Sequence, residues 1–520
     1  MSLELLPASI APSVGQIHAW HSLPGASAAV ALLASLEQEK RFALVITKDA
    51  YDSQEWYEAL RFFAADNSEF SLRVFPDREV LPYDYFSPHP DIISDRLKTL
   101  YHLQNESYGV CLVTASTLLA RVCPRSYVNR DSLVIEIDQK IDARQIKIQL
   151  DNAGYQHRDS VYEHGEYAVR GSLLDIFPMG SELPYRIELF DDEVSSLRTF
   201  DADTQRSLDK ITRIEILPAA EVCLDKEAIN HFRDQWHNEF KHNPLVCPIY
   251  EDVLAGIPYA GIESYLPMFY ASTDTLLDYL PENSLLFSYP EFEKTATDFL
   301  NNVNDRFEQQ AIDPTRPLLS PDSLYLKVDE CFSKMSAFAR ITTTAKVLDK
   351  KPNTARGLFS CGAATNPQLL IDDHAENALT RLQAFLTSSP KHSVDTRHVL
   401  FCVESLGRRE IFSDKLKAIG INALSCDTWQ DFKAAVENNN DTPQTGIAVA
   451  AFNRGASFPA SGISVIAEPE LFGVTIKPKA RSNKERNMLA DAAIHNLIEL
   501  NIGSPIVHLD HGVGRYLGLE

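Results

Sequence analysis

The 520-residue chain is 44% hydrophobic and 23% charged, as ordinary globular proteins are, and its length predicts three to five domains. A net charge of −23 at pH 7 argues against a protein whose main task is to grip nucleic acid, because phosphate binding depends on clustered Lys and Arg. The eight cysteines show no CxxC pair and no zinc spacing, so we expect buried free thiols and no metal site. Without a signal-peptide pattern or an 18-residue apolar window, we expect a cytoplasmic protein with no membrane span.

Short apolar runs alternate with helical periodicity from about residue 15 to 127. They predict strands near 17–20, 43–47, 72–75 and 110–114, and helices near 26–36 and 53–64. This alternation is typical of a parallel sheet with flanking helices. Residues 22–30 lie where a nucleotide-binding domain keeps its phosphate loop, yet they hold one glycine and no lysine, and no Gly-Lys pair occurs in the chain. We therefore predict a degenerate P-loop-type α/β domain that neither binds nor hydrolyses ATP.

A β-hairpin is the clearest local signal in the chain. Two runs rich in apolar and β-branched residues flank the Pro/Gly/Ser loop 178–184. In this hairpin the expected cross-strand pairs are Phe177 with Tyr185, Ile176 with Arg186, and Ser172 with Phe190. The period of two then places Arg170, Arg186 and Phe190 on one face. The opposite, core face is expected to carry Leu173, Phe177, Tyr185, Ile187 and Leu189.

Two readings of the arginine-bearing face follow from the residues alone. Arginine beside an exposed aromatic ring is the composition of a protein-binding hot spot, since both offer large contact area and Arg adds bidentate hydrogen bonding. Alternatively, Arg186 and Glu188 are solvated surface charges and Phe190 covers the sheet edge. In either case we expect these side chains to point outward and to contribute little to folding stability.

The same residues carry a family resemblance. The run from Gly165-Glu166-Tyr167 through Arg170-Gly171, Asp175-Ile-Phe-Pro178 and Phe190-Asp-Asp-Glu to Thr204-Gln205-Arg206-Ser207 closely resembles bacterial transcription-repair coupling factors, in a domain that they share with the excinuclease protein UvrB. The resemblance implies that this domain binds UvrA, another protein of the same excinuclease. It also implies that Arg170, Arg186 and Phe190 are the contact residues.

The later parts of the chain give weaker signals. Residues 260–281 resemble the family's return into its first domain, and strands near 399–403, 446–451 and 463–467 predict a further α/β domain. Asp372 or Asp373 is expected to cap a helix rather than to bind magnesium, since no phosphate loop exists. A basic linker at 477–486 and a helix at 488–500 precede residues 503–518, which resemble the opening of the family's RNA-polymerase-interacting, CarD-type domain. His508 and His511 are expected in a tight turn of that small barrel rather than in a metal site.

The predicted fold is therefore an α/β multidomain chain: a degenerate P-loop-type domain with an inserted small α+β UvrA-binding domain, a second α/β domain, and the start of a small CarD-like β-barrel. The expected limits are 1–127 and 216–345 for the interrupted first domain, 128–215 for the insertion, 346–474 for the next domain, 475–502 for the linker and helix, and 503–520 for the barrel segment.

The resemblance implies a function in transcription-coupled repair: recruitment of UvrA to RNA polymerase stalled at DNA lesions. No catalytic or cofactor-binding residue is expected in this chain; ATP and magnesium would serve the DNA-translocating motor of the intact family member. Expected partners are UvrA, RNA polymerase through the segment beginning near Gly503, and DNA for the full-length protein. The rivals are a UvrB-like helicase, which would carry a Gly-rich Lys-Thr loop near residue 25, and a CarD-like transcription regulator, which leaves the preceding 500 residues unexplained.

Overall fold

The structure is a computed structural model, and the chain divides into two compact units, Met1–Val474 and Thr475–Glu520. The described residues are 5–6, 11–64, 69–241, 243–344, 357–371, 379–387, 398–438, 442–473, 505–508 and 512–515. Among the described helices, none is long and apolar enough to cross a membrane.

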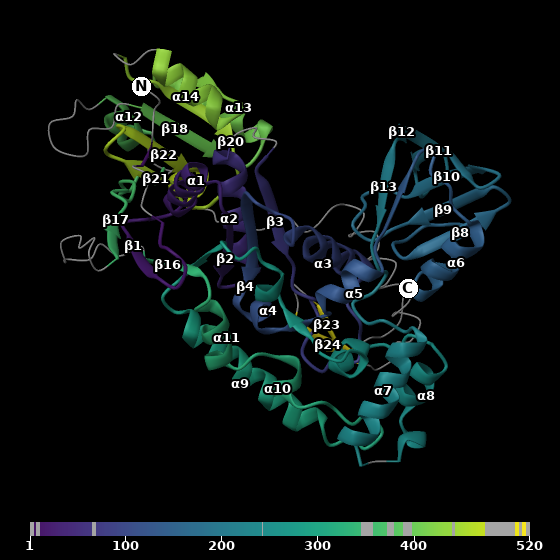
Figure 1. The fold of residues 1–520 in the computed structure, drawn as a ribbon. Coiled ribbons are helices and arrows are strands. Elements are labelled where there is room, and N and C mark those ends of the chain that lie inside the picture. The colour runs from purple at the N-terminus through teal and green to yellow at the C-terminus, as the bar shows by residue number, and fades with distance from the viewer. Residues whose placement is uncertain are drawn as a thin grey trace. The chain divides into compact units, whose positions relative to one another are not determined.

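A parallel sheet of seven strands forms the first domain, in the order β17-β1-β16-β15-β2-β4-β3 (Figure 1). Its strands are β1 (Ile17–His21), β2 (Phe42–Thr47), β3 (Ser71–Phe75), β4 (Gly109–Thr114), β15 (Leu285–Ser288), β16 (Ala339–Thr344) and β17 (Leu358–Ser360). The four strands predicted before residue 127 are confirmed. Every residue of β2 and β4 is buried, as expected of a parallel sheet covered on both faces.

Alternate residues of β2 enter two different cores. Phe42, Leu44 and Ile46 join one apolar cluster with α3 (Pro90–Leu103) and α4 (Ala115–Leu119). Ala43 and Val45 join the other cluster, with α1 (Ser27–Glu39) and α2 (Ala50–Phe63). The strand's period of two therefore places helices on both faces of the sheet.

The chain leaves this sheet after β4 and rejoins it at β15. Between them, β6 (Leu133–Glu136) pairs antiparallel with β13 (Arg213–Ile216), so the first and last strands of an inserted segment lie side by side. The predicted limits of 128 and 215 lie beside this ribbon. Between them lie α6 (Ala143–Asn152) and a sheet in the order β12-β11-β10-β9-β8-β7. Its strands are β7 (Gln156–His157), β8 (Glu166–Arg170), β9 (Leu173–Phe177), β10 (Tyr185–Phe190), β11 (Glu193–Phe200) and β12 (Ser207–Ile211).

Helices, short turns and short strands connect the first sheet to the insertion and back again. Before the insertion lie β5 (Arg121–Val122) and α5 (Arg125–Arg130). After it lie α7 (Lys226–Glu239), α8 (Pro248–Leu254), α9 (Phe292–Gln310), α10 (Pro321–Leu324) and α11 (Val328–Met335), with 3-10 turns at Pro244–Val246, Ile262–Phe269 and Leu276–Tyr279 and the short strand β14 (Asp274–Thr275). Tyr265, Leu266 and Tyr279, in the segment 260–281, are buried.

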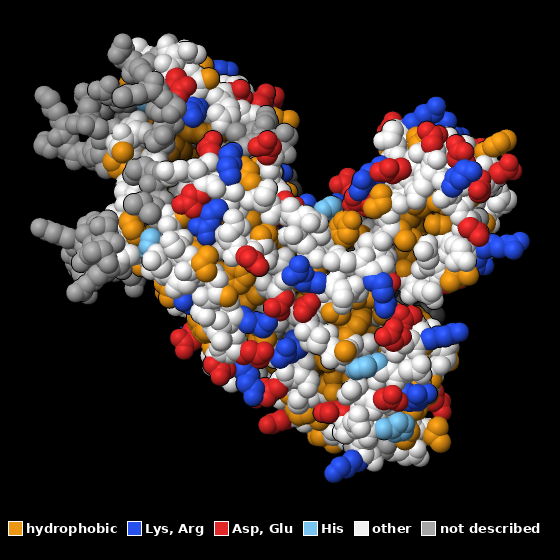
Figure 2. Space-filling view, in the orientation of Figure 1, with side chains coloured by type: hydrophobic (Ala, Val, Ile, Leu, Met, Phe, Trp, Pro, Cys, Tyr) orange, Lys and Arg blue, Asp and Glu red, His pale blue; other side chains and the backbone are white. Residues whose placement is uncertain are grey.

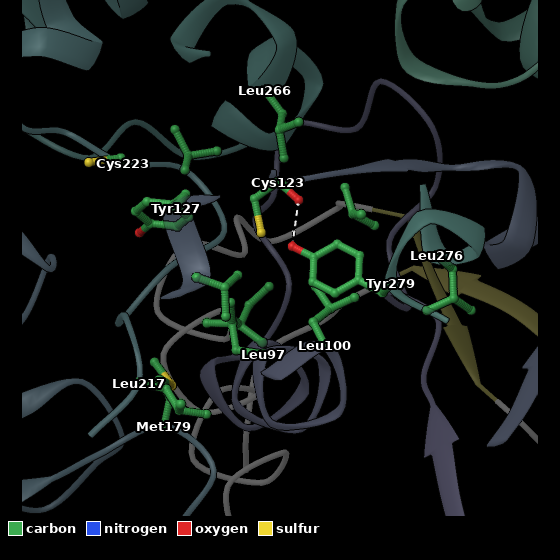
Figure 3. Close-up of a cluster of buried hydrophobic side chains, with 14 of the residues drawn as sticks. Leu97, Leu100, Cys123, Tyr127, Met179, Leu217, Cys223, Leu266, Leu276 and Tyr279 are labelled. Carbon is green, nitrogen blue, oxygen red and sulfur yellow. Dashed lines mark hydrogen bonds between the residues drawn. The ribbon is translucent and has the colours of Figure 1, made fainter. Parts of the chain in front are cut away.

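Side chains from several of these segments meet in one core. Figure 3 shows Tyr279 among leucines of α3, its hydroxyl donating to the carbonyl oxygen of Cys123 at 2.8 Å. Met179 and Leu217, from the inserted segment and its exit, lie in the same cluster. All eight cysteines are buried free thiols, as predicted.

A second α/β domain follows, with the sheet order β19-β20-β18-β22-β21. Its elements are α12 (Thr380–Thr387), β18 (His398–Val403), α13 (Leu406–Ala418), β19 (Leu424–Ser425), α14 (Trp429–Asn438), β20 (Thr445–Val449), β21 (Ala456–Phe458), β22 (Ile463–Ala467) and α15 (Glu468–Phe472). The three predicted strands are confirmed. The predicted start of this domain at residue 346 is too early, because β17 pairs with β1 in the first sheet.

Several predicted features fall outside the described residues: Asp372, Asp373, the basic stretch 477–486, the helix 488–500 and His511. In the second unit, β23 (Pro505–His508) pairs antiparallel with β24 (Gly512–Arg515), and His508 is paired with Gly512. The residues that would form the predicted turn, 509–511, lie outside the described residues.

The loop before α1 contacts the second α/β domain. The backbone N–H of Ala26 donates to the carbonyl oxygen of Arg454 at 2.9 Å. Gly25 has φ +53°, and a Cβ there would clash with the carbonyl oxygens of Arg454 and Gly455. The backbone N–H of Asn453 donates to the Glu55 carboxylate at 3.0 Å. Backbone from the later domain thus lies directly against the residues where a phosphate loop would be.

A buried ion triad joins the first domain to the exit of the insertion. The fully buried Glu221 carboxylate accepts from Arg96 Nε at 2.6 Å and from Arg78 Nη2 at 2.5 Å. Arg96 lies on α3 and also stacks on the Phe75 ring. Burial acts to raise the pKa of Glu221, but the two guanidiniums outweigh it and lower that pKa to about 2.

We predict that Glu221→Gln lowers the free energy of unfolding at pH 7 by roughly 3 kcal/mol, because it leaves Arg96 buried without its countercharge. The folded pKa of about 2 lies below the ordinary 4.5, so this stabilisation is present above pH 4.5 and is lost as the pH falls toward 2. Urea denaturation of both proteins should therefore show a stability gap at neutral pH that narrows in acid. The exposed control Glu227→Gln should unfold like the wild type, and a pH-independent gap would contradict the triad's role.

Candidate functional site

The inserted sheet pairs β9 with β10 one residue away from the predicted register. Arg186 lies opposite Asp175, and Tyr185 lies opposite Ile176. The predicted pairs Phe177 with Tyr185, Ile176 with Arg186 and Ser172 with Phe190 are therefore wrong. The connecting loop explains the shift: Met179 bridges Leu217, and the backbone N–H of the next residue, Gly180, donates to Ser94 of α3. These long-range contacts, rather than the loop's own sequence, determine where β10 begins.

The shift leaves Arg170, Arg186 and Phe190 on one face, as predicted, but changes their neighbours. Arg170 of β8 and Glu188 of β10 both pair with Leu173 of β9, so the three share a face. Phe190 lies two positions beyond Glu188 in β10 and is therefore on the same face. Leu173, Asp175 and Phe177 consequently lie on the arginine face rather than on the core face. The assignments of Leu173 and Phe177 to the core face are corrected, whereas Tyr185, Ile187 and Leu189 stay on it.

The arginine face is covered at one end and open at the other. A small apolar cluster closes the covered end: Val161, Ala168, Phe177, Phe200 and Ala202. At the open end Phe190 is 75% exposed. It stands beside the two-residue turn Asp191-Asp192, where Asp191 has φ +54° and Phe190 pairs with Glu193. Figure 2 shows basic, acidic and apolar side chains intermingled on the surface of this part of the molecule.

Asp175 organises the two arginines, a role that the sequence analysis did not predict. Its side chain is 1% exposed and forms ion pairs with both Arg170 and Arg186. Arg186 donates from Nε to Oδ1 at 2.7 Å and from Nη2 to Oδ2 at 2.8 Å, which is bidentate geometry. The signal that could have revealed it is an acidic residue interrupting the apolar strand Leu173–Phe177, since a buried carboxylate requires a cationic partner.

Arg186 is held in place by several groups and does not point freely outward. Its Nη1 donates to the Gln205 carbonyl oxygen and to Ser207 Oγ, both at 3.2 Å, and its guanidinium stacks over the Phe200 ring at 4.7 Å. Its side chain is only 18% exposed, and its hydrogen bonds to Asp175 raise its pKa. The expectation that Arg186 contributes little to folding is therefore revised.

Arg170 is arranged differently. Its side chain is 45% exposed and binds Asp175 through Nη2, the one hydrogen bond from its guanidinium within the described chain. A guanidinium has five N–H donors, so Arg170 keeps most of them for a partner. One carboxylate shared by two guanidiniums also leaves one net positive charge. Together with Phe190, this forms a cationic and aromatic surface suited to an acidic protein partner.

A separate cavity of about 180 Å³ lies at the carboxyl ends of β3 and β4, where α/β proteins often bind ligands. Part of its polar lining is committed internally, since Thr117 Oγ1 donates to Asp77 at 2.8 Å and Arg78 binds Glu221, whereas the buried Nη2 of Arg96 has no hydrogen-bond partner among the described residues. Among the described residues, no group of three or more His, Cys, Asp or Glu side chains could hold a metal ion. We therefore take the arginine face of the inserted sheet as the candidate site.

Two family models match the chain. The UvrB interaction domain matches residues 133–221, which include the whole inserted sheet. The D3 domain of MFD matches residues 393–471, within the second α/β domain.

Whole-chain comparisons agree with these matches. A transcription-repair-coupling factor of Haemophilus influenzae is 37% identical over 500 residues, covering 96% of this chain and 41% of that protein. The Escherichia coli protein of the same name is 38% identical over 498 residues, with the same coverage, and that of Bacillus subtilis is 25% identical over 517 residues, covering 96% of this chain and 42% of that protein. The chain thus spans about two fifths of the length of the curated relatives it matches. Over the residues that it spans, the chain is similar to the N-terminal part of transcription-repair-coupling factors.

Proposed function

We propose that the chain binds UvrA through the face that carries Arg170, Arg186 and Phe190, and thereby recruits nucleotide excision repair to RNA polymerase stalled at DNA lesions. The observation that carries this proposal is the coincidence of two findings. The matched UvrB interaction domain contains the whole sheet, and its open end presents a 75% exposed phenylalanine beside a partly exposed arginine. Exposed aromatic rings and arginines are the residues that dominate protein-binding energy.

The D3 match favours this function over that of a UvrB-like helicase, because it ties the second α/β domain to coupling factors. Contact with RNA polymerase through the 503–520 segment, as the start of a CarD-like barrel, is part of the same proposal; the β23–β24 ribbon supports a strand-turn-strand there. DNA translocation driven by ATP and magnesium is proposed for the intact protein alone.

For this chain we propose no ATP hydrolysis and a first domain that descends from a P-loop fold without keeping its nucleotide. The phosphate-binding lysine is missing from residues 22–30. The Ala26 amide, which would otherwise face a phosphate, already donates to Arg454. The loop therefore lacks the lysine that a nucleotide needs, and one of its N–H groups is already engaged.

Phe190→Ala should weaken UvrA binding about thirtyfold, close to 2 kcal/mol, because the ring is the largest exposed apolar group on the face. Arg170→Ala should weaken binding about tenfold through the loss of charge-assisted hydrogen bonds. Calorimetry with purified UvrA measures both. Phe86 is 70% exposed on a loop of the first domain and provides the matched control. Phe86→Ala should bind UvrA as the wild type does. Wild-type affinity in Phe190→Ala would refute the proposed surface.

Arg186→Ala should reduce UvrA affinity and also lower the free energy of unfolding by roughly 2 to 3 kcal/mol, because Asp175 then keeps only Arg170 in a buried position. A double-mutant cycle with Asp175→Ala should give a coupling energy of roughly 1 to 3 kcal/mol. Chemical denaturation of the four proteins supplies the values. Additive losses would mean that the pair does not interact in solution.

Titration of the chain with ATP and magnesium should show no saturable heat at micromolar affinity, since the loop lacks the lysine and the Ala26 amide is already engaged. Asn453→Ala, which removes the side-chain hydrogen bond from Nδ2 to Glu55 and keeps the backbone one, should not create binding, because the lysine is still absent. Saturable binding by either protein would overturn the assignment of a lost nucleotide site.

A further inference from the structure

Cationic side chains continue across the sheet from Arg186. In the observed register Arg186 lies opposite Arg198 of β11, and Arg198 lies opposite Lys210 of β12. Directly paired residues share a face, so these three cations form a row that begins at Asp175 and ends at the edge strand. With strands about 4.8 Å apart, the row spans roughly 10 Å.

The charges of Arg198 and Lys210 are not neutralised by carboxylates of the described chain. Arg198 donates from Nε to Ser196 Oγ at 3.3 Å, and Lys210 is exposed. Among the residues that the structure describes, neither forms an ion pair with a carboxylate. Like charges directly opposite one another across strands destabilise a sheet. Folding alone therefore gives no reason to align three cations here, whereas a partner that covers them does.

The charge of the surroundings indicates which partner fits. Carboxylates on the same face border the row without pairing with Arg198 or Lys210: Glu166 pairs with Arg158, and Glu188 and Glu193 lie on the Phe190 side of Arg186. The chain as a whole carries a net charge of −23, which repels a polyanion such as DNA at long range. A short cationic row bordered by acids instead matches a protein surface with a few carboxylates.

We propose that Arg186, Arg198 and Lys210 extend the partner-binding surface from Phe190 to the edge strand β12 and receive an acidic patch of the bound protein. This inference rests on the proposed binding of UvrA. It adds that the surface of UvrA that contacts the row is acidic. Arg198 and Lys210 act mainly by attracting the partner during encounter, because neither is ion-paired within the described residues and both lie toward the edge strand β12.

The test is the association rate of the 520-residue chain with purified UvrA, measured between about 50 and 300 mM salt. The double variant Arg198→Gln/Lys210→Gln should associate about three- to tenfold more slowly at low salt, with the gap closing at high salt and the dissociation rate little changed. Arg198→Lys should retain most of the rate because it keeps the charge. A matched double variant on α7, Lys226→Gln/Arg233→Gln, removes the same net charge elsewhere and should change the rate by less than about twofold.

An association rate and salt dependence equal to the wild type, or a loss no larger than that of the α7 variant, would overturn the inference while leaving UvrA binding itself intact. Failure of the wild-type chain to bind UvrA would overturn both proposals. The last measurement is the binding of duplex DNA. If Arg198→Gln/Lys210→Gln loses DNA binding while its association rate with UvrA is unchanged, the row binds nucleic acid and the inference of an acidic protein partner is rejected. Thermal unfolding of each variant should match the wild type, since removing repulsion costs no stability.

Discussion

The buried carboxylate of Asp175 determines how the inserted sheet presents its surface. A carboxylate that is 1% exposed is costly unless cations neutralise it, and two arginines from neighbouring strands do so. Arg186, which binds Asp175 through two hydrogen bonds, becomes part of the folded framework. Arg170 keeps most of its N–H donors available for a partner. A structural interaction and a recognition surface are thus built from the same three side chains, so mutations at Arg186 combine both effects.

This surface is rigidly attached to the first domain. Ser94 of α3 accepts from the backbone of Gly180, and His164 is hydrogen-bonded to Asp91 at 2.7 Å. Glu221 then holds the exit of the insertion to Arg78 and Arg96. Because these contacts converge on one helix, the inserted sheet is fixed at several points along its base. Preorganisation of this kind lowers the ordering cost of binding a partner.

Backbone of the second α/β domain lies against the loop before α1 of the first domain. The parallel strands of the first domain and the helices on both faces of its sheet are fully packed, and the loop before α1 is contacted by Arg454 and Gly455 of the second α/β domain. The contact satisfies the N–H group of Ala26 at a helix start, which would otherwise need another acceptor. The residues of this loop therefore serve the packing of one domain on the other.

The sequence by itself determined where the predicted strands and helices lie, but not the face of every strand residue, since Leu173 and Phe177 lie on the arginine face. Apolar runs of period two and 3.6 located the strands and helices, and alternation placed Arg170, Arg186 and Phe190 together, because these signals are local. Tertiary structure alone decided the register of β9 and β10, the burial of Asp175, the addition of β17 to the first sheet and the contact of Arg454 with Ala26. Each of these depends on residues far apart in the chain, such as Gly180 with Ser94. No local pattern encodes such pairs, since a one-residue slip preserves the alternation of a single strand while changing every partner across the sheet.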